Sequence, residues 1–207
     1  MNPQIDVEST RSLTPKGEAT RARIIDAATA EFAAFGIAGA RVDRIAGEAR
    51  SNKAQLYAYF GSKDGLFDAV FFGSFDHIMG AVPIDADDLA DWAVRLYDHY
   101  LQRPDHIRLA TWARLERRPT GHLTPDADRV DATKLDQIAQ AQRAGLVVGG
   151  VDPFDVMAMV IAMSMAWSPV SNVYAASADE AAELHDRRRE LLRESVVRVV
   201  RPHPPTS

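Results

Sequence analysis

The sequence predicts an all-α protein of about nine helices, with an N-terminal three-helix domain and a larger C-terminal helical domain. Three observations support this fold class. Apolar residues recur at intervals of three and four along most of the chain. Prolines fall at expected helix starts or between helices, where they disturb least. No segment shows the alternation of apolar and polar residues that is typical of a β-strand.

The composition of the chain limits the kinds of site that it can contain. The chain has 207 residues and no cysteine, so it can bury a core without disulfides and offers no thiolate ligand to a metal. We expect neither a cofactor nor a metal site. Because the N-terminus lacks a basic segment followed by an apolar one, we expect no secretion signal and a cytoplasmic protein. The apolar run 154–167 is shorter than the roughly 20 residues that cross a bilayer, which predicts a buried helix.

The first helix follows a polar segment, residues 1–13, which we expect to be a disordered arm. It can begin at Thr14-Pro15 or at Thr20, because threonine caps free amides and proline suits the first helical position. Gly36 predicts that it ends near Phe35. Its apolar face comprises Ile24, Ile25, Ala28, Phe32 and Phe35.

Two short helices and a tight turn come next. The spacing of Val42, Ile45, Ala46 and Ala49 predicts an amphipathic helix of two turns. After Arg50 and Ser51, Asn52 can cap a helix that runs to Phe60. This is the layout of a helix-turn-helix DNA reader.

A fourth helix is predicted after Gly61 and Ser62, with Ser62 as its cap. We expect it to link the N-terminal domain to the rest of the chain. Its inward face comprises Leu66, Phe67, Val70 and Phe71. Beyond Pro83 the remaining helices are predicted over 87–102, 104–117, 128–144, 153–175 and 179–200. The proline-rich tail 201–207 is expected to be disordered.

The net charge of the N-terminal domain differs in sign from that of the rest of the chain. Residues 11–65 hold nine basic and six acidic side chains, a net of +3; since the whole chain carries −5, the remainder carries −8. A positive N-terminal domain on an acidic body suits a DNA reader with a separate regulatory part. We therefore predict a DNA-binding domain over 14–65 and an effector-binding and dimerisation domain over 66–200.

The predicted helix 52–60 carries side chains suited to DNA. Leu56 and Phe60, four residues apart, should face the core. Gln55 can form a paired hydrogen bond with adenine, whereas Lys53 can contact guanine or a phosphate. Tyr57 and Lys63 are better suited to phosphate oxygens, where they would fix the register without reading sequence.

Residues 20–70 resemble the DNA-binding head of the tetracycline-repressor (TetR) family of bacterial transcription regulators. The resemblance is carried by the segments 23–28, 32–36, 42–46, 52–60 and 62–66, including Leu-Tyr-Ala-Tyr-Phe followed by Ser-Lys. It implies DNA contact by Lys53, Gln55, Tyr57 and Lys63, to which the capping residue Asn52 is added as a candidate. It also implies an effector-binding body and a homodimer.

Two residues depart from the family pattern. Arg41 stands where threonine usually caps the second helix, and Arg50 stands where glycine usually occupies the turn. Arginine is a poor cap, and a residue other than glycine is strained in a left-handed turn. Both arginines can instead contact phosphates. The departures put the turn geometry in question but not the fold.

The body offers aromatic and methionine side chains that can line an apolar cavity or simply fill a core. The core interpretation is favoured at helical spacing. Candidate ligand contacts are Trp92, Tyr97, Trp112, Met163 and Trp167.

The helix 153–175 is apolar nearly all round, and 179–200 has an apolar stripe. These two helices are therefore expected to form half of a four-helix dimer interface. A two-fold dimer would place two recognition helices about 34 Å apart on a palindromic site. One or two dimers can occupy such an operator.

The expected function is a ligand-responsive transcription regulator, a repressor that a small molecule releases from DNA. An enzyme is not expected: the histidines lack metal-ligand spacing, and no phosphate loop or nucleophile motif occurs. The alternative is a small-molecule binding protein, or an enzyme, whose head no longer reads DNA. Arg41 and Arg50 are the sequence support for that alternative.

Overall fold

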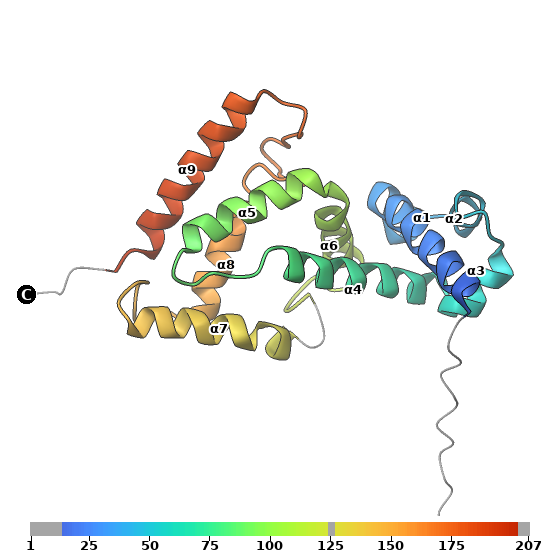
Figure 1. Ribbon diagram of the computed structural model, residues 1–207, viewed down its shortest axis with the longest axis horizontal. Helices are drawn as coiled ribbons and strands as arrows, with labels where there is room; N and C mark the ends of the chain where they lie inside the picture. Colours follow the sequence, from blue (N-terminus) through green and yellow to red (C-terminus); the bar gives the residue numbers. More distant parts are fainter. Residues whose placement is uncertain (1–13, 124–126, 203–207) are drawn as a thin grey trace, which may run out of the picture.

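The computed structural model describes residues 14–123 and 127–202, which form nine helices and contain no β-strand (Figure 1). This confirms the predicted all-α fold. The expected arm 1–13 and residues 203–207 of the expected tail lie outside the described residues. In the described ranges, no helix combines the length and the apolarity that crossing a bilayer requires.

The helix α1 (Pro15–Gly39) begins at the first of its two predicted starts. The Thr14 side chain accepts a hydrogen bond from the amide of Gly17 (3.2 Å), and Pro15 occupies the first turn. Gly36 breaks the helix with φ 73°, as predicted, and one further turn follows. A side chain at Gly36 would collide with Trp112, since a Cβ there would lie 2.9 Å from its ring.

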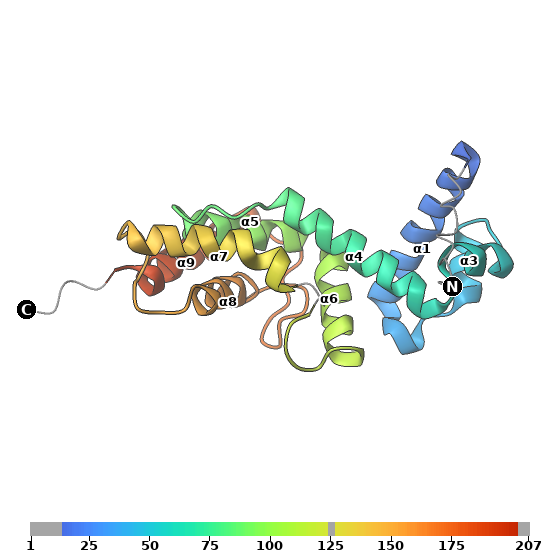
Figure 2. The same ribbon diagram turned by 90° about the horizontal axis from the view of Figure 1, so that it is seen from below.

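Two short helices complete the N-terminal domain: α2 (Val42–Glu48) and α3 (Lys53–Phe60). The fourth, α4 (Lys63–Ala81), starts in this domain and runs into the body, as both views show (Figures 1 and 2). Ser62 caps α4 by accepting from the amide of Gly65 (2.9 Å). The core of the N-terminal domain includes Leu109 and Ala113, which belong to a later helix. The two parts of the molecule therefore share one packed junction.

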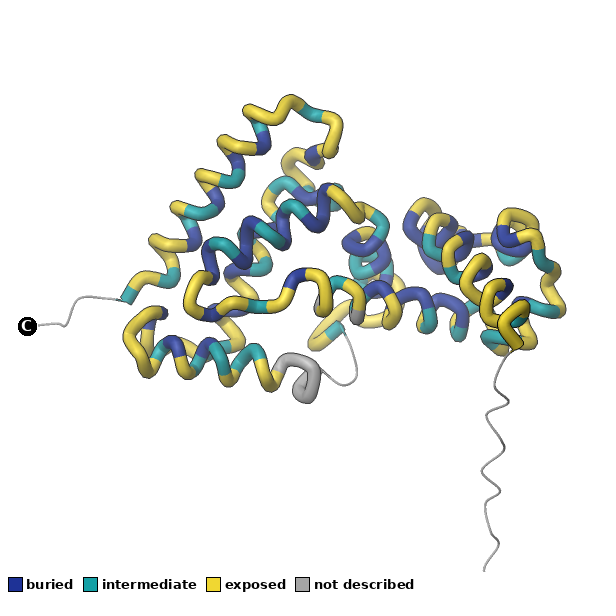
Figure 3. The backbone as a smooth tube through the Cα atoms, in the orientation of Figure 1, coloured by how far each residue is buried: buried dark blue, intermediate teal, exposed yellow. Residues whose placement is uncertain are grey.

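The body contains α5 (Leu89–Gln102), α6 (Pro104–Glu116), α7 (Ala127–Arg143), α8 (Pro153–Ser164) and α9 (Ala182–Val200). Helix α5 is its centre, with ten buried residues, and it packs against α8 and α9. Figure 3 shows α5 as a nearly continuous buried stretch, whereas α9 alternates between buried and exposed positions. The body core is separate from the core of the N-terminal domain.

The predicted helix 153–175 is wrong in length, because α8 ends at Ser164 and residues 165–181 form an irregular loop. Pro169 disfavours a helical conformation at Ser168. The loop folds back on itself, since the amide of Ala176 donates to the carbonyl of Trp167 (3.1 Å). Trp167 is partly buried against the body core. The apolar run therefore covers a helix and part of the loop that follows it. The two helices expected to form the dimer interface become α8 and α9, with these shorter bounds.

Candidate nucleic-acid interface

The turn between α2 and α3 has the expected left-handed residue, but that residue is an arginine. Arg50 has φ 49°, and it is the one residue other than glycine with positive φ in the described part of the chain. The amide of Arg50 donates to the carbonyl of Gly47 (3.1 Å) and that of Ser51 donates to Ala46 (2.9 Å). These are the two bonds of a Schellman motif, which usually has glycine at this position. The turn therefore forms without glycine.

Side chains from α1 hold this turn and the start of α2. The Nε of Arg23 donates to the carbonyl of Ala49 (3.2 Å), which ends α2. Arg41 makes no capping bond with its side chain, and its amide instead donates to Glu31 Oε1 (2.8 Å). Arg44 pairs with the same carboxylate at 2.6 Å. Sequence reasoning missed Arg23 and Glu31, because their partners lie on other helices.

Glu31 is ionised despite being buried. Burial raises the pKa of its carboxyl group, but the hydrogen bonds from Arg44 and from the amide of Arg41 outweigh this and leave the pKa lowered. A buried charge is stable only when it is paired and hydrogen-bonded, as it is here. Glu31 therefore fixes the N-cap residue through its own amide, whereas a capping threonine would accept from the amide of Asp43 or Arg44.

The outer face of α3 is flat and flanked by polar groups. Ala54 and Ala58 are exposed and four residues apart, so the centre of the face carries no bulk. Lys53 and Tyr57 are exposed beside them, and Gln55 is half-buried. Leu56 is fully buried, as predicted. This shape allows the helix to approach a groove closely.

Several of the candidate DNA-binding side chains are already engaged. Asn52 Oδ1 caps α3 by accepting from the amide of Gln55 (2.8 Å), and Gln55 Oε1 accepts from the hydroxyl of Ser51 (2.8 Å). Lys53 pairs with Asp43 at 2.8 Å, and that hydrogen bond raises the pKa of Lys53. Both groups of this pair are exposed, so the pair can exchange with a phosphate at small cost.

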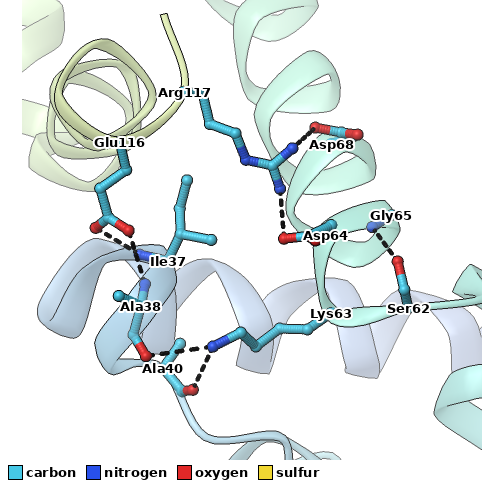
Figure 4. Close-up of polar contacts among 10 residues, drawn as sticks. All are labelled: Ile37, Ala38, Ala40, Ser62, Lys63, Asp64, Gly65, Asp68, Glu116 and Arg117. Carbon is cyan, nitrogen blue, oxygen red and sulfur yellow. Dashed lines mark hydrogen bonds and ion pairs between the residues drawn. The ribbon is translucent and has the colours of Figure 1, made fainter. Parts of the chain in front are cut away.

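Lys63 lies apart from this face. Its ammonium group donates to the carbonyls of Ala38 (3.3 Å) and Ala40 (3.2 Å), at the end of α1 (Figure 4). A lysine commonly satisfies free carbonyls at a helix end in this way. In this structure Lys63 therefore joins the start of α4 to the end of α1.

The C-terminal end of α6 and the residue that follows it contact the N-terminal domain at two points (Figure 4). The Glu116 carboxylate accepts hydrogen bonds from the amides of Ile37 (3.0 Å) and Ala38 (2.8 Å). Arg117, directly after α6, pairs with Asp64 (2.7 Å) and Asp68 (3.5 Å) on α4. We call these contacts the α6 clamp. It links the body to both α1 and α4.

The candidate ligand contacts do not form one site. Trp92 and Tyr97 are buried in the body core, and the hydroxyl of Tyr97 is bonded to His185 Nδ1 (2.7 Å). Trp167 packs edge-on against Tyr97, and Met163 contacts the same core. Trp112 instead donates to the carbonyl of Ala33 on α1 (3.3 Å). The first four therefore fill the body core, and the fifth belongs to the junction.

Clefts on the described surface lie elsewhere. One of about 630 Å³ lies between the α4–α5 loop, α5 and α7, and includes Arg95 and Gln140. A second, of about 420 Å³, lies between α4 and the end of α6 and includes Phe71 and Arg117. Neither is lined by the five candidate ligand contacts.

Three histidines that are scattered in the sequence meet where α4, α5 and α6 cross. His99 Nε2 lies 3.2 Å from His106 Nδ1, and the ring of His77 packs against both. Burial lowers the pKa of His106 to about 4, with Asp105 opposing the shift. Across the described residues, no set of three or more acidic or histidine side chains is arranged to hold a metal ion.

Comparisons with known proteins agree along the chain. Residues 24–70 match the family model described as bacterial regulatory proteins, tetR family. Residues 88–198 match the model of the tetracyclin repressor-like C-terminal domain. The chain is 40% identical over 149 residues to the HTH-type transcriptional repressor SCO4008 of Streptomyces coelicolor, covering 71% of this chain and 77% of that one.

A second curated relative and two solved structures extend the comparison. The HTH-type transcriptional repressor NicS of Pseudomonas putida is 30% identical over 45% of this chain and 48% of its own length. The transcriptional regulator SCO4942 of Streptomyces coelicolor superimposes with a TM-score of 0.76 at 42% identity, over 87% of this chain and 98% of that one. A TetR family regulator of Marinobacter aquaeolei gives 0.64 at 20% identity, over 87% and 96%, which supports the fold.

Proposed function

The chain belongs to the TetR family of bacterial transcription regulators, and on this premise we propose that it is a repressor that binds a palindromic operator as a dimer and is released by a small molecule. The observation that carries the proposal is the flat, exposed face of α3, flanked by Lys53, Gln55 and Tyr57. Its two curated relatives are named as transcriptional repressors. Operator binding would place the protein on the nucleoid.

We assign DNA contact to Asn52, Lys53, Gln55 and Tyr57 on the exposed part of α3. Arg41 and Arg50 are exposed at the ends of α2, where guanidinium groups can reach the phosphates on either side of a groove. Two of the three N–H groups of the Lys63 ammonium donate to backbone carbonyls, so the third is left to donate to a phosphate. Residues 14–65 would then read DNA, and residues 66–200 would bind the effector and form the dimer.

A second copy of the chain is the proposed partner for α8 and α9. These helices expose Met159 (51%), Leu191 (50%) and Val197 (48%), which a monomer would leave in water. Pairing across a two-fold axis would cover them and set two recognition helices about one DNA turn apart.

The α6 clamp would couple effector binding in the body to the position of the DNA-binding domain. A ligand that binds better to a body in which α6 has shifted would move Glu116 and Arg117, and with them α1 and α4. Its leverage is limited to its difference in affinity for the two states. The effector itself is not assigned, because Trp92, Tyr97 and Trp167 pack in or against the body core and Trp112 lies at the junction with α1.

The test is binding of the full-length protein to a duplex of the DNA upstream of its own gene, followed by fluorescence anisotropy over a series of salt concentrations. We expect affinity to fall steeply with salt. Tyr57→Ala should weaken binding about tenfold while thermal unfolding and dimerisation stay unchanged. Tyr57→Phe keeps the ring and removes the hydroxyl, so it separates their contributions to DNA binding. Folded, dimeric protein without salt-dependent binding to this duplex would contradict the proposal.

A further inference from the structure

The two side-chain amides of the recognition helix have their oxygens turned back toward its own start. Asn52 Oδ1 accepts from the backbone amide of Gln55, and Gln55 Oε1 accepts from the hydroxyl of Ser51, both at 2.8 Å. The oxygen and the nitrogen of a planar amide lie on opposite sides of its central carbon. With each oxygen held toward the turn, the N–H groups of both amides are the ones left to meet a ligand.

The other polar groups of α3 add donors. Lys53 carries an ammonium group, which has donors only. No acidic residue occurs from Lys53 to Phe60. Asp43 on α2 is the carboxylate beside this face, and it is paired with Lys53 at 2.8 Å. Tyr57 can donate or accept. The face that enters a groove therefore presents mainly N–H donors.

A face of donors fits one base better than the other three. In the major groove guanine offers two neighbouring acceptors, N7 and O6. Adenine offers one acceptor and one donor, cytosine offers a donor, and thymine offers one acceptor beside a methyl group. Resting on the function proposed above, we propose that Lys53 and Gln55 read guanine, and that Ser51 is the positioning residue that sets this preference.

Without Ser51, Gln55 would be expected to read adenine. The paired contact with adenine requires Oε1 to accept from N6 while Nε2 donates to N7. To make it, Gln55 must turn its oxygen toward the base and give up the bond from Ser51. Ser51 is half-buried and outside the expected contact surface, so its influence is exerted through Gln55.

The experiment is selection from a randomised duplex library by full-length protein at one fixed salt concentration, followed by sequencing. Wild type is compared with Lys53→Ala, Gln55→Ala and Ser51→Ala. Lys53→Ala and Gln55→Ala should each weaken the base preference at the position that the removed side chain contacts. We expect the wild-type protein to prefer guanine at both positions. Ser51→Ala should cut the preference for guanine over adenine at the Gln55 position by about tenfold, because it frees Oε1.

Two controls sharpen the result. Thr29→Ala removes a hydroxyl that bonds within α1, and it should leave base preference unchanged. In a selected duplex, 7-deazaguanine at the Gln55 position lacks the N7 acceptor and should weaken wild-type binding about tenfold.

The possible failures can be told apart. If wild type selects adenine at the Gln55 position and Ser51→Ala does not alter it, the guanine inference is overturned while the regulator function stands. If folded dimer enriches no sequence at all, the proposed function itself is overturned.

Discussion

Contacts of single residues explain how the chain accommodates Arg41 and Arg50, which are unfavourable residue types at their positions. Arg50 occupies the left-handed turn position that glycine usually fills, and the turn keeps both of its backbone bonds. Arg41 does not cap α2 with its side chain, and Glu31 on α1 instead holds the start of α2 through the Arg41 amide and the Arg44 side chain. These contacts weaken the case for a head that has lost its DNA-reading geometry, because the turn and the start of α2 form in spite of both departures.

The conformation of Arg50 leads to a stability prediction. Arg50→Gly should raise the free energy of unfolding by about 1 kcal/mol, because a left-handed conformation costs roughly that much for a residue with a Cβ. Urea unfolding at one protein concentration measures this. Arg50→Ala keeps the Cβ and serves as the control, so a similar gain in both variants would show that charge, and not backbone strain, is responsible.

At the scale of elements, α6 decides how the head is held. Its last residue, Glu116, contacts the end of α1, and Arg117, directly after α6, contacts the start of α4. Lys63 ties those same two helix ends together. Under the proposed function, an effector that changed the position of α6 would therefore act on the helices that carry α3.

Removing one half of the α6 clamp should loosen the head without unfolding it. Because the ion pairs of Arg117 are partly exposed, Arg117→Ala should change stability by less than about 1 kcal/mol. Affinity for the upstream duplex should fall about fivefold, as expected for about 1 kcal/mol of coupling. Amide hydrogen exchange should quicken in the first turns of α4. Arg118→Ala, the neighbouring exposed arginine, is the matched control, and an equal effect there would argue against the clamp.

At the scale of the whole molecule, the reading domain and the outer faces of α8 and α9 lie at opposite ends of an elongated chain (Figure 1). Helix α4 runs from the reading domain into the body (Figure 2). Contacts between two copies would thus set the separation of two reading domains without touching DNA. The proposed dimer would in this sense set the spacing of the operator.

This arrangement predicts the effect of a charge on the outer face of α9. Leu191→Asp should raise the dimer dissociation constant by at least about 100-fold, because an unpaired charge would be buried between the copies. Light scattering after size-exclusion chromatography measures the change. Leu115→Asp on α6 is the control, since Leu115 is more exposed (65%) and lies outside the proposed interface. A Leu191→Asp protein that stays dimeric would place the interface elsewhere.

Most of the fold could be predicted because its signals are local. Thr14, Asn52 and Ser62 cap helices within three residues of themselves, and Gly36 interrupts α1 where predicted. Helical spacing identified Leu56 as a core residue. The end of α8 was missed because Trp167, in the loop after α8, is partly buried against the body core, and periodicity does not distinguish such a loop from a buried helix.

The sequence by itself determined the all-α class, the starts of α3 and α4 and the face of α3, since each depends on residues within a few positions of one another. Only the tertiary structure decided how the polar groups are used. Glu116 meets Ile37 across 79 positions, and Lys63 meets Ala38 across 25. Trp112 joins the head while Trp92 and Tyr97 fill the body. Such pairings depend on how helices pack, because helical spacing fixes which face a residue lies on but not which helix covers it.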